Sequence, residues 1–206
     1  KKTTSNIIQK AISDNVDVII TSGGVSMGTA DHMKQILVDF NATIHFGRLA
    51  MKPGKPTTFA TIVNPINGKE ILVFCLPGNP VSCVVCSQLL VLPCLKVLSS
   101  KVHYENDDSG TSSGSFHPKI NVLLKDDITL DKDRAEYHRC VISYDANSST
   151  FYADSTGVQR SSRLLSMIGT TEKGENVTAN GLLVLPRGGA IKKGEMVEAL
   201  LIGGLM

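Results

Sequence analysis

Apolar runs and helical periods alternate along the first hundred residues of the chain. The apolar run at 17–20 leads into a glycine-rich turn at 21–28, and apolar residues then recur at helical spacing across 31–40. A second apolar run at 71–76 ends in a turn with two prolines, after which helical periodicity returns at 81–92. Strand, turn and helix repeated in this order predict an α/β unit with a largely parallel sheet.

Prolines and an asparagine mark the ends of the second helix. Asn79 is a good N-cap residue and Pro80 suits the first helical position, so the helix is expected to begin there. Pro93 is expected to bend or end it. Residues 1–10 already carry a helical pattern, begin without Met and contain no signal-peptide core, so we expect the chain to be part of a longer protein.

The second half of the chain has a different pattern of apolar and polar residues. Residues 99–115 are rich in Ser, Gly, Asp and Asn, which is typical of a linker or long loop. Beyond them only 161–168 looks helical, whereas five short segments look like strands: 119–124, 137–144, 150–153, 182–185 and 196–202. They predict a small all-β barrel or sandwich. We therefore expect an α/β domain at 1–100, a linker at 101–115 and a β domain at 116–206.

Composition narrows the class of protein. The 206 residues have a formal net charge of +2, which is too balanced for binding nucleic acid through charge alone. No uninterrupted apolar run approaches the roughly 18 residues of a transmembrane helix, so no membrane span is expected. Five cysteines, with Cys83 and Cys86 on an apolar helical face and no second Cys or His pair at ligand spacing, favour buried free thiols over a zinc or redox site. This cysteine usage predicts a cytoplasmic protein.

The glycine-rich turn is the first candidate binding element. Ser22, Gly23, Gly24, Ser26 and Gly28 follow the first strand and precede a helix. Glycines let backbone N–H groups point outward, and a helix N-terminus adds partial positive charge, so such a turn can hold a phosphate. The turn matches neither G-x-x-x-x-G-K-[ST] nor G-x-G-x-x-G, so no nucleotide fingerprint applies, and a tight turn without a ligand remains an alternative.

A basic segment is the second candidate. Arg48, Lys52 and Lys55 lie in a stretch that contains no acidic side chain from 41 to 68. Arg48 and Lys52 are four positions apart and share one face of an extended chain. Two cations without nearby acidic partners suit a bound anion, although a solvated basic strand edge would fit the same pattern.

A rigid turn and an acidic residue complete the candidates. Pro77, Gly78 and Pro80 lock the second strand-to-helix turn, and Asn79 opens a helix with free N–H groups. Asp31 at the start of the first such helix either complements the helix dipole or holds a divalent cation beside a bound anion. Three rigid turns of this kind in one sheet predict a multiply anionic small molecule as the ligand.

These blocks resemble the MoeA family, which includes the gephyrin E domain and consists of molybdopterin molybdenumtransferases. The resemblance rests on TSGGVSMGxxD at 21–31, FGRLAMKPGKPT at 46–57 and LPGNPVS at 76–82, in the family's order and spacing. TGVQRSSR at 156–163 and GLLVLP at 181–186 are similar to the family's C-terminal β domain. The match looks closest to animal gephyrin-like proteins. It implies a molybdopterin-binding fold, with a partial three-layer, mostly parallel sheet domain followed by a small all-β domain.

The resemblance also implies a reaction and the residues that serve it. Molybdate would enter the dithiolene of adenylylated molybdopterin with release of AMP, assisted by Mg²⁺, in a homodimer whose site lies between subunits. Asp31 would stand at the metal or molybdate, and Arg48 and Lys52 would hold molybdate and phosphate. The other implied residues would bind the pterin phosphate and nucleotide: Ser22, Gly23, Gly24, Ser26, Gly28, Lys55, Pro77, Gly78, Asn79, Pro80, Ser162 and Arg163.

Other functions stay open beside this one. The family has further domains, so the 206 residues alone are expected to be inactive or nearly so, and an adenylyltransferase domain is expected as a fused or separate partner. A gephyrin-like scaffold that clusters receptors is the main alternative, although LPRGGA at 185–190 is shorter than its gephyrin counterpart. An adenylyltransferase of related fold would share the glycine turn but not the other blocks. Asp31, Arg48 and Lys52 favour the transferase.

Overall fold

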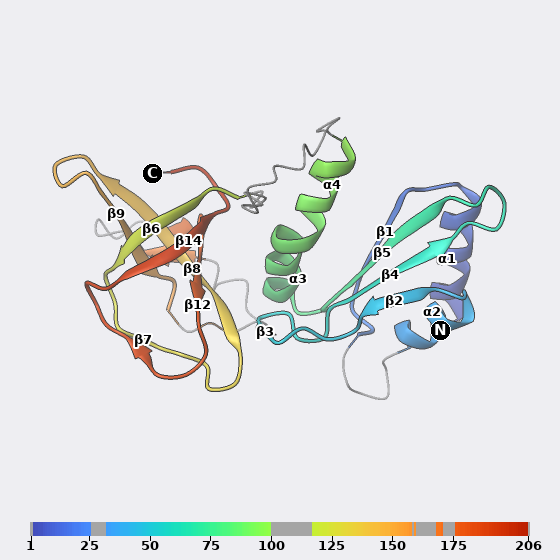
Figure 1. Cartoon of the computed structure of the whole chain (residues 1–206), viewed down its shortest axis with the longest axis horizontal. Helices are drawn as coiled ribbons and strands as arrows, with labels where there is room; N and C mark the ends of the chain where they lie inside the picture. Colours follow the sequence, from blue (N-terminus) through green and yellow to red (C-terminus); the bar gives the residue numbers. More distant parts are fainter. Residues whose placement is uncertain are drawn as a thin grey trace, which may run out of the picture.

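The computed structural model describes residues 2–25, 32–99, 117–157, 159, 168–170 and 176–205. Within these ranges the chain forms an α/β unit and a β unit, with the helix α3 (Pro80–Cys86) lying between them (Figure 1). The predicted linker at 101–115 and nearly all of the predicted helix at 161–168 lie outside the described residues. Five candidate site residues also lie outside them: Ser26, Gly28, Asp31, Ser162 and Arg163.

Four strands form the sheet of the α/β unit, in the order β1 (Val18–Ser22), β5 (Glu70–Leu76), β4 (Thr58–Val63) and β2 (Thr43–Phe46). β1 and β5 run parallel, whereas β5–β4 and β4–β2 are antiparallel. The α/β class is confirmed, but the described sheet is mixed rather than mostly parallel. The physical reason is the short connection at 64–69, which is too short for the crossover that parallel neighbours need.

Successive residues of β5 are buried in two different cores. Ile71, Val73 and Cys75 pack with residues of α1 (Lys2–Ser13) and α2 (Met33–Asp39). Phe74 and Leu76 pack instead with residues of α3 and the helix that continues it. Neighbouring side chains of a strand point to opposite faces, so helices cover both faces of this sheet. The three-layer arrangement explains why β5 reads as a continuous apolar run.

α3, a π-helical turn (Ser87–Val91) and α4 (Leu92–Ser99) form one helical stretch of 20 residues. Asn79 is its N-cap residue and Pro80 its first helical residue, as predicted. Pro93 does not end it, because a π-helical turn directly before a proline can accommodate the missing N–H. Among the described residues this is the one stretch long and apolar enough to cross a membrane by length and composition. Val81 and Val85 of α3 are fully buried inside the protein, whereas α4 has no buried residue.

Five strands of the β unit close into a barrel. They are β6 (Lys119–Leu124), β8 (Ala135–Asp145), β9 (Thr150–Ser155), β12 (Gly181–Leu185) and β14 (Met196–Leu201). Hydrogen bonding follows the order β12, β14, β6, β9, β8, and β8 then pairs with β12, which closes the ring. The fold is therefore a barrel rather than a sandwich.

Two short antiparallel pairs accompany the barrel strands. β7 (Ile128–Thr129) pairs with β13 (Ala190–Ile191), and β10 (Ile168–Thr170) pairs with β11 (Asn176–Thr178). Ile168, expected to close a helix, therefore begins a strand, because it has an extended partner in β11.

Two contacts join the units. Val81 and Val85 of α3 form a buried cluster with Leu182 and Leu200 of the barrel. In addition, β3 (Met51–Lys52) adds to the start of β8 as a parallel strand. The basic segment therefore leaves the α/β sheet, touches the barrel and returns, which places it at the junction of the units (Figure 1).

Candidate functional site

The carboxyl ends of β1 and β5 bring two of the candidate turns together. Ser22 ends β1 opposite Leu76, which ends β5, and the Gly23 N–H donates to the Leu76 carbonyl at 2.9 Å. Gly23 and Gly24 have φ values of 86° and 70°, in the left-handed region that glycine adopts without strain. α3 begins directly after β5, so its N-terminus opens at the same edge as the glycine turn.

Gly78 lies directly against Gly23. A Cβ added at Gly78 would stand 3.2 Å from the Gly23 Cα, closer than the roughly 3.5–4.0 Å of an ordinary carbon contact. No side chain fits between the two turns, so backbone faces backbone here. Ligands of open α/β sheets bind at such carboxyl edges, and helix N-termini there attract anions.

The basic segment also begins and ends at this edge. The chain leaves β2 after Phe46 and enters β4 at Thr58, which lies opposite Cys75 near the end of β5. Within the segment the Leu49 N–H donates to the Lys55 carbonyl at 2.9 Å and closes a loop. All three candidate turns therefore lie along one edge of the sheet.

The three basic side chains of this segment have different surroundings. Arg48 and Lys55 are exposed, and neither forms an ion pair with another residue of the described part of the chain. Lys52 is half-buried, with its Nζ 3.0 Å from Glu136 Oε2 and 3.7 Å from Asp131 Oδ2. The expectation that Lys52 lacks acidic partners is therefore wrong. Both carboxylates come from the β unit, which the local sequence does not show.

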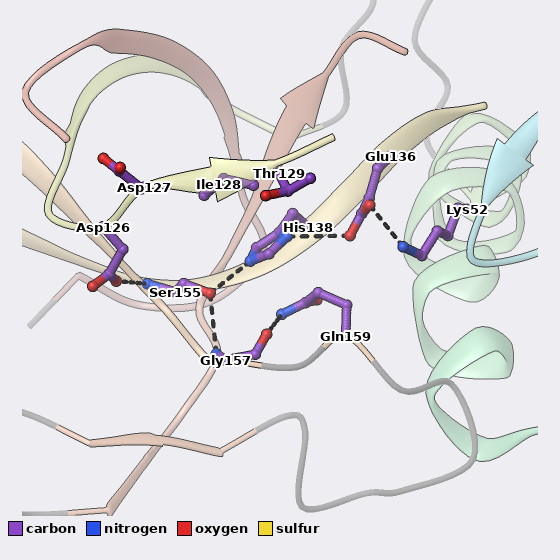
Figure 2. Close-up of a pocket in the computed structure, with 10 residues that line it drawn as sticks. All are labelled: Lys52, Asp126, Asp127, Ile128, Thr129, Glu136, His138, Ser155, Gly157 and Gln159. Carbon is purple, nitrogen blue, oxygen red and sulfur yellow. Dashed lines mark hydrogen bonds and ion pairs between the residues drawn. The ribbon is translucent and has the colours of Figure 1, made fainter. Parts of the chain in front are cut away.

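Glu136 is the first member of a hydrogen-bonded chain through the β unit (Figure 2). Its Oε1 lies 3.1 Å from His138 Nδ1, and His138 Nε2 lies 2.7 Å from Ser155 Oγ. The Gly157 N–H donates to Ser155 Oγ at 3.0 Å, so the Ser155 hydroxyl is free to donate to Nε2. An ionised Glu136 carboxylate can only accept a hydrogen bond, so His138 Nδ1 carries a proton and donates it to Glu136. Glu136 is 3% exposed and His138 6% exposed.

The charges around Lys52 perturb one another. Burial alone would raise the pKa of Glu136, but hydrogen bonds from His138 and Lys52 outweigh it and leave that pKa below its usual value. A hydrogen bond from Arg134 is the main cause that lowers the pKa of Asp131 to about 2. Burial lowers the pKa of Arg139 to about 10, and the charge of Glu136 opposes that fall. At neutral pH the junction therefore carries ionised groups of both signs.

A cavity of about 600 Å³ opens beside this chain of side chains. Lys52 reaches it from the α/β unit, and the remaining lining comes from the β unit (Figure 2). The lining residues are Lys52, Asp126, Asp127, Ile128, Thr129, Glu136, His138, Ser155, Gly157 and Gln159. Carboxylates, hydroxyl groups and the Lys52 ammonium line the cavity together with apolar atoms, so it presents charges of both signs.

The residues that the structure describes do not supply a magnesium site. Among them no group of three or more His, Cys, Asp or Glu side chains is placed to hold a metal ion. Asp31, on which the expectation of Mg²⁺ rests, lies outside these residues. All five cysteines are free, as predicted, but only Cys75, Cys86 and Cys140 are buried, whereas Cys83 and Cys94 are half-buried.

The described candidate residues lie in three places. The edge of the sheet gathers seven of them: Ser22, Gly23, Gly24, Pro77, Gly78, Asn79 and Pro80. Lys52 lies at the barrel, and Arg48 and Lys55 lie on the exposed part of the connecting loop. Sequence reasoning missed Glu136 and His138. His138 lies in the predicted strand at 137–144 and Glu136 directly precedes it, so their spacing of two residues, which places both on one face, was the available signal.

Both units match known domain families. Residues 1–97 match the family described as a probable molybdopterin binding domain, and residues 121–202 match the MoeA C-terminal region (domain IV). A solved structure, the molybdopterin biosynthesis MoeA protein from Pyrococcus horikosii, superposes with a TM-score of 0.64. The match covers 99% of this chain and 41% of that chain at 23% identity, which shows a shared fold.

Curated relatives agree with the domain matches. Gephyrin of Dictyostelium discoideum is 45% identical over 202 residues, which cover 93% of this chain and 26% of that protein. The molybdenum cofactor synthesis protein cinnamon of Drosophila melanogaster is 41% identical over 154 residues, covering 75% of this chain and 23% of that protein. The molybdopterin molybdenumtransferase of a Nostoc strain is 42% identical over 130 residues, covering 63% and 27%.

The chain thus spans about a quarter of the length of the curated relatives that it matches. The two domain families match this chain in the order that the sequence blocks predict. Nearly the whole of this chain shares its fold with part of a solved MoeA protein. The chain belongs to the MoeA family, which includes the gephyrin E domain.

Proposed function

We propose that the protein containing this chain inserts molybdate into the dithiolene of adenylylated molybdopterin and releases AMP, in the synthesis of the molybdenum cofactor. The observation that carries the proposal is that three turns suited to binding anions lie along one edge of the sheet. Both substrates are anions, and relatives of this chain carry the names of molybdenumtransferases and cofactor synthesis proteins.

In this proposal the sheet edge and the basic segment have different roles in binding the substrates. The glycine turn and the N-terminus of α3 hold the phosphates through backbone N–H groups. Arg48 and Lys52 supply positive charge for molybdate and for the phosphate as its charge changes. Arg48 is always charged and cannot donate a proton, so its part is purely electrostatic. Asp31 would stand at the metal or molybdate, as the resemblance to the family implies.

We propose the finer features on the resemblance to the family. These are use of Mg²⁺, a homodimer, a cytoplasmic location and an adenylyltransferase domain as a fused or separate partner. The five free thiols support a reducing compartment. Light scattering on the full-length protein tests the dimer, and turnover after chelation with EDTA and re-addition of Mg²⁺ tests the metal.

Calorimetric titration tests the binding site directly. AMP, with Mg²⁺ and molybdate, is titrated into the full-length protein and into its Asp31→Asn and Lys52→Ala variants. We expect either substitution to weaken binding by more than tenfold, equivalent to about 1.4 kcal/mol. Lys119→Ala, which removes an exposed ion pair with Glu198 on the barrel, is the matched control and should bind normally.

The opposite result is equally informative. If the wild-type protein binds neither AMP nor molybdate, the turns are architecture only and the transferase proposal fails. A pull-down with peptides from receptor cytoplasmic loops then tests the scaffold function in its place.

A further inference from the structure

Lys52 is tied to the barrel by more than one interaction. Lys52 pairs with Glu136 in the register of β3 and β8, and its ammonium forms the 3.0 Å ion pair with the Glu136 carboxylate. A lysine side chain has many rotamers of similar energy when nothing fixes it. At this place both its backbone and its charge are held by a residue of the other unit.

Glu136 itself is held in one orientation. One carboxylate oxygen accepts from His138 Nδ1–H, which leaves the other oxygen facing Lys52. His138 is in turn fixed by the 2.7 Å contact between its Nε2 and Ser155 Oγ. Because Glu136 and His138 are buried, solvent does not compete for these hydrogen bonds.

The order Ser155, His138, Glu136 is also that of a catalytic triad, but the backbone around Ser155 argues against acyl transfer. A nucleophile needs nearby N–H groups that can stabilise an oxyanion. The Ser155 N–H donates to Asp126 Oδ2 at 3.1 Å, and the Gly157 N–H donates to Ser155 Oγ. The Thr156 N–H donates to the Arg139 carbonyl at 3.2 Å, so all three N–H groups next to the hydroxyl are occupied. The chain of hydrogen bonds ends at Lys52, so we expect it to act on the position of the Lys52 ammonium.

We propose that Glu136 is a positioning residue for Lys52. It holds the ammonium at the wall of the cavity between the two units, and His138 and Ser155 hold the Glu136 carboxylate in the orientation that does so. The inference rests on the proposed function, since the step that Lys52 serves is the transfer of molybdate. It adds that the barrel sets the geometry of a charge carried by the α/β unit.

The test is a set of variants of the full-length protein, assayed for AMP release from adenylylated molybdopterin with molybdate. Glu136→Gln keeps the size of the side chain but removes its charge, and we expect kcat to fall about tenfold with KM changed less than threefold. In a Lys52→Ala background the same Glu136→Gln substitution should cause no further loss, because the group that Glu136 positions is gone. Glu198→Gln, in an exposed ion pair of the same barrel, is the control and should be fully active.

His138 provides a conservative rescue. His138→Asn can place an amide N–H near the position of Nδ1, so it should stay within about threefold of wild type. His138→Leu cannot donate to Glu136 and should lose activity as Glu136→Gln does. Equal activity in the two His138 variants would overturn the inference. So would a Glu136→Gln loss that persists undiminished in the Lys52→Ala background, which would mark Glu136 as merely structural.

A second measurement separates this inference from the proposed function. Amine labelling at fixed pH, read by mass spectrometry, reports how freely Lys52 reacts, with Lys119 as the internal reference. We expect Glu136→Gln to raise the Lys52 labelling rate at least threefold. If the wild-type protein releases no AMP, the proposed function fails while this labelling result still stands. Unchanged labelling would overturn the inference, whatever the activity.

Discussion

Replacing Gly78 with alanine tests whether the two turns at the sheet edge must touch. The added Cβ would lie 3.2 Å from the Gly23 Cα and 3.7 Å from the Gly23 nitrogen. Gly78 does not have a positive φ, so alanine is compatible with its backbone conformation. The effect of the substitution is therefore the close approach alone.

The size of the effect depends on how far the backbone of the two turns can move apart. Ordinary carbon contacts lie at about 3.5–4.0 Å, so the turns must separate by a few tenths of an ångström. Both partners are backbone, and Gly23 is tied to the Leu76 carbonyl by its 2.9 Å hydrogen bond. Overpacking of this kind costs about 1–3 kcal/mol. We expect a fall in Tm of roughly 2–12 °C and, because the backbone proposed to bind phosphate moves, roughly tenfold weaker binding of AMP.

Thermal unfolding and AMP titration of the same protein decide the matter. Gly204→Ala is the control, because a Cβ there meets nothing within 4 Å and should change neither quantity. A Gly78→Ala protein with wild-type Tm and wild-type affinity would refute the reasoning. A lower Tm with unchanged affinity would show that the contact serves folding only and that the ligand lies elsewhere.

Three further changes test other parts of the structure. Asn180→Ala removes hydrogen bonds to both the N–H and the carbonyl of buried Ile142, at 2.6 and 2.9 Å, and should cost about 2–4 kcal/mol in urea unfolding. Asp131 has a pKa of about 2, held low by Arg134, so its stabilisation is present above about pH 4 and lost as pH falls through 2. Asp131→Asn should therefore flatten the fall in urea midpoint between pH 5 and pH 2, and an unchanged slope would contradict the pairing. Burial raises the pKa of Cys140 to about 12, so iodoacetamide should alkylate it only after unfolding, which peptide mass spectrometry would show.

Much of the α/β unit was predictable because its signals are local. The apolar run of β5 reflects burial of the strand on both faces. Asn79 and Pro80 favour the start of a helix through their own backbone preferences, so they mark the start of α3 without any tertiary contact. The antiparallel β4–β5 hairpin was predictable too, because Asn67-Gly68 is a strong hairpin signal. The prediction of a mostly parallel sheet rested on the alternation of apolar runs and helical periods and left the Asn67-Gly68 signal out.

The surroundings of Lys52 were not predictable in the same way. Around Lys52 the sequence shows only cations, and no rule of spacing connects it with Glu136 in the β unit. That contact depends on the pairing of a strand of two residues with β8, which tertiary packing of α3 against the barrel brings about. A short strand pairing has almost no propensity signal of its own.

The ion pair changes what each cation of the basic segment can do. At 3.0 Å and an effective dielectric constant of about 20, Lys52 and Glu136 attract each other by roughly 5–6 kcal/mol before desolvation is counted. Asp131 adds a second carboxylate at 3.7 Å, so an ion farther away experiences little net positive charge from Lys52. An incoming dianion is therefore drawn mainly by Arg48 and Lys55, which are exposed and form no ion pair with the residues described. Lys52 acts only at contact, where its fixed position rather than its net field determines how well it meets a developing charge.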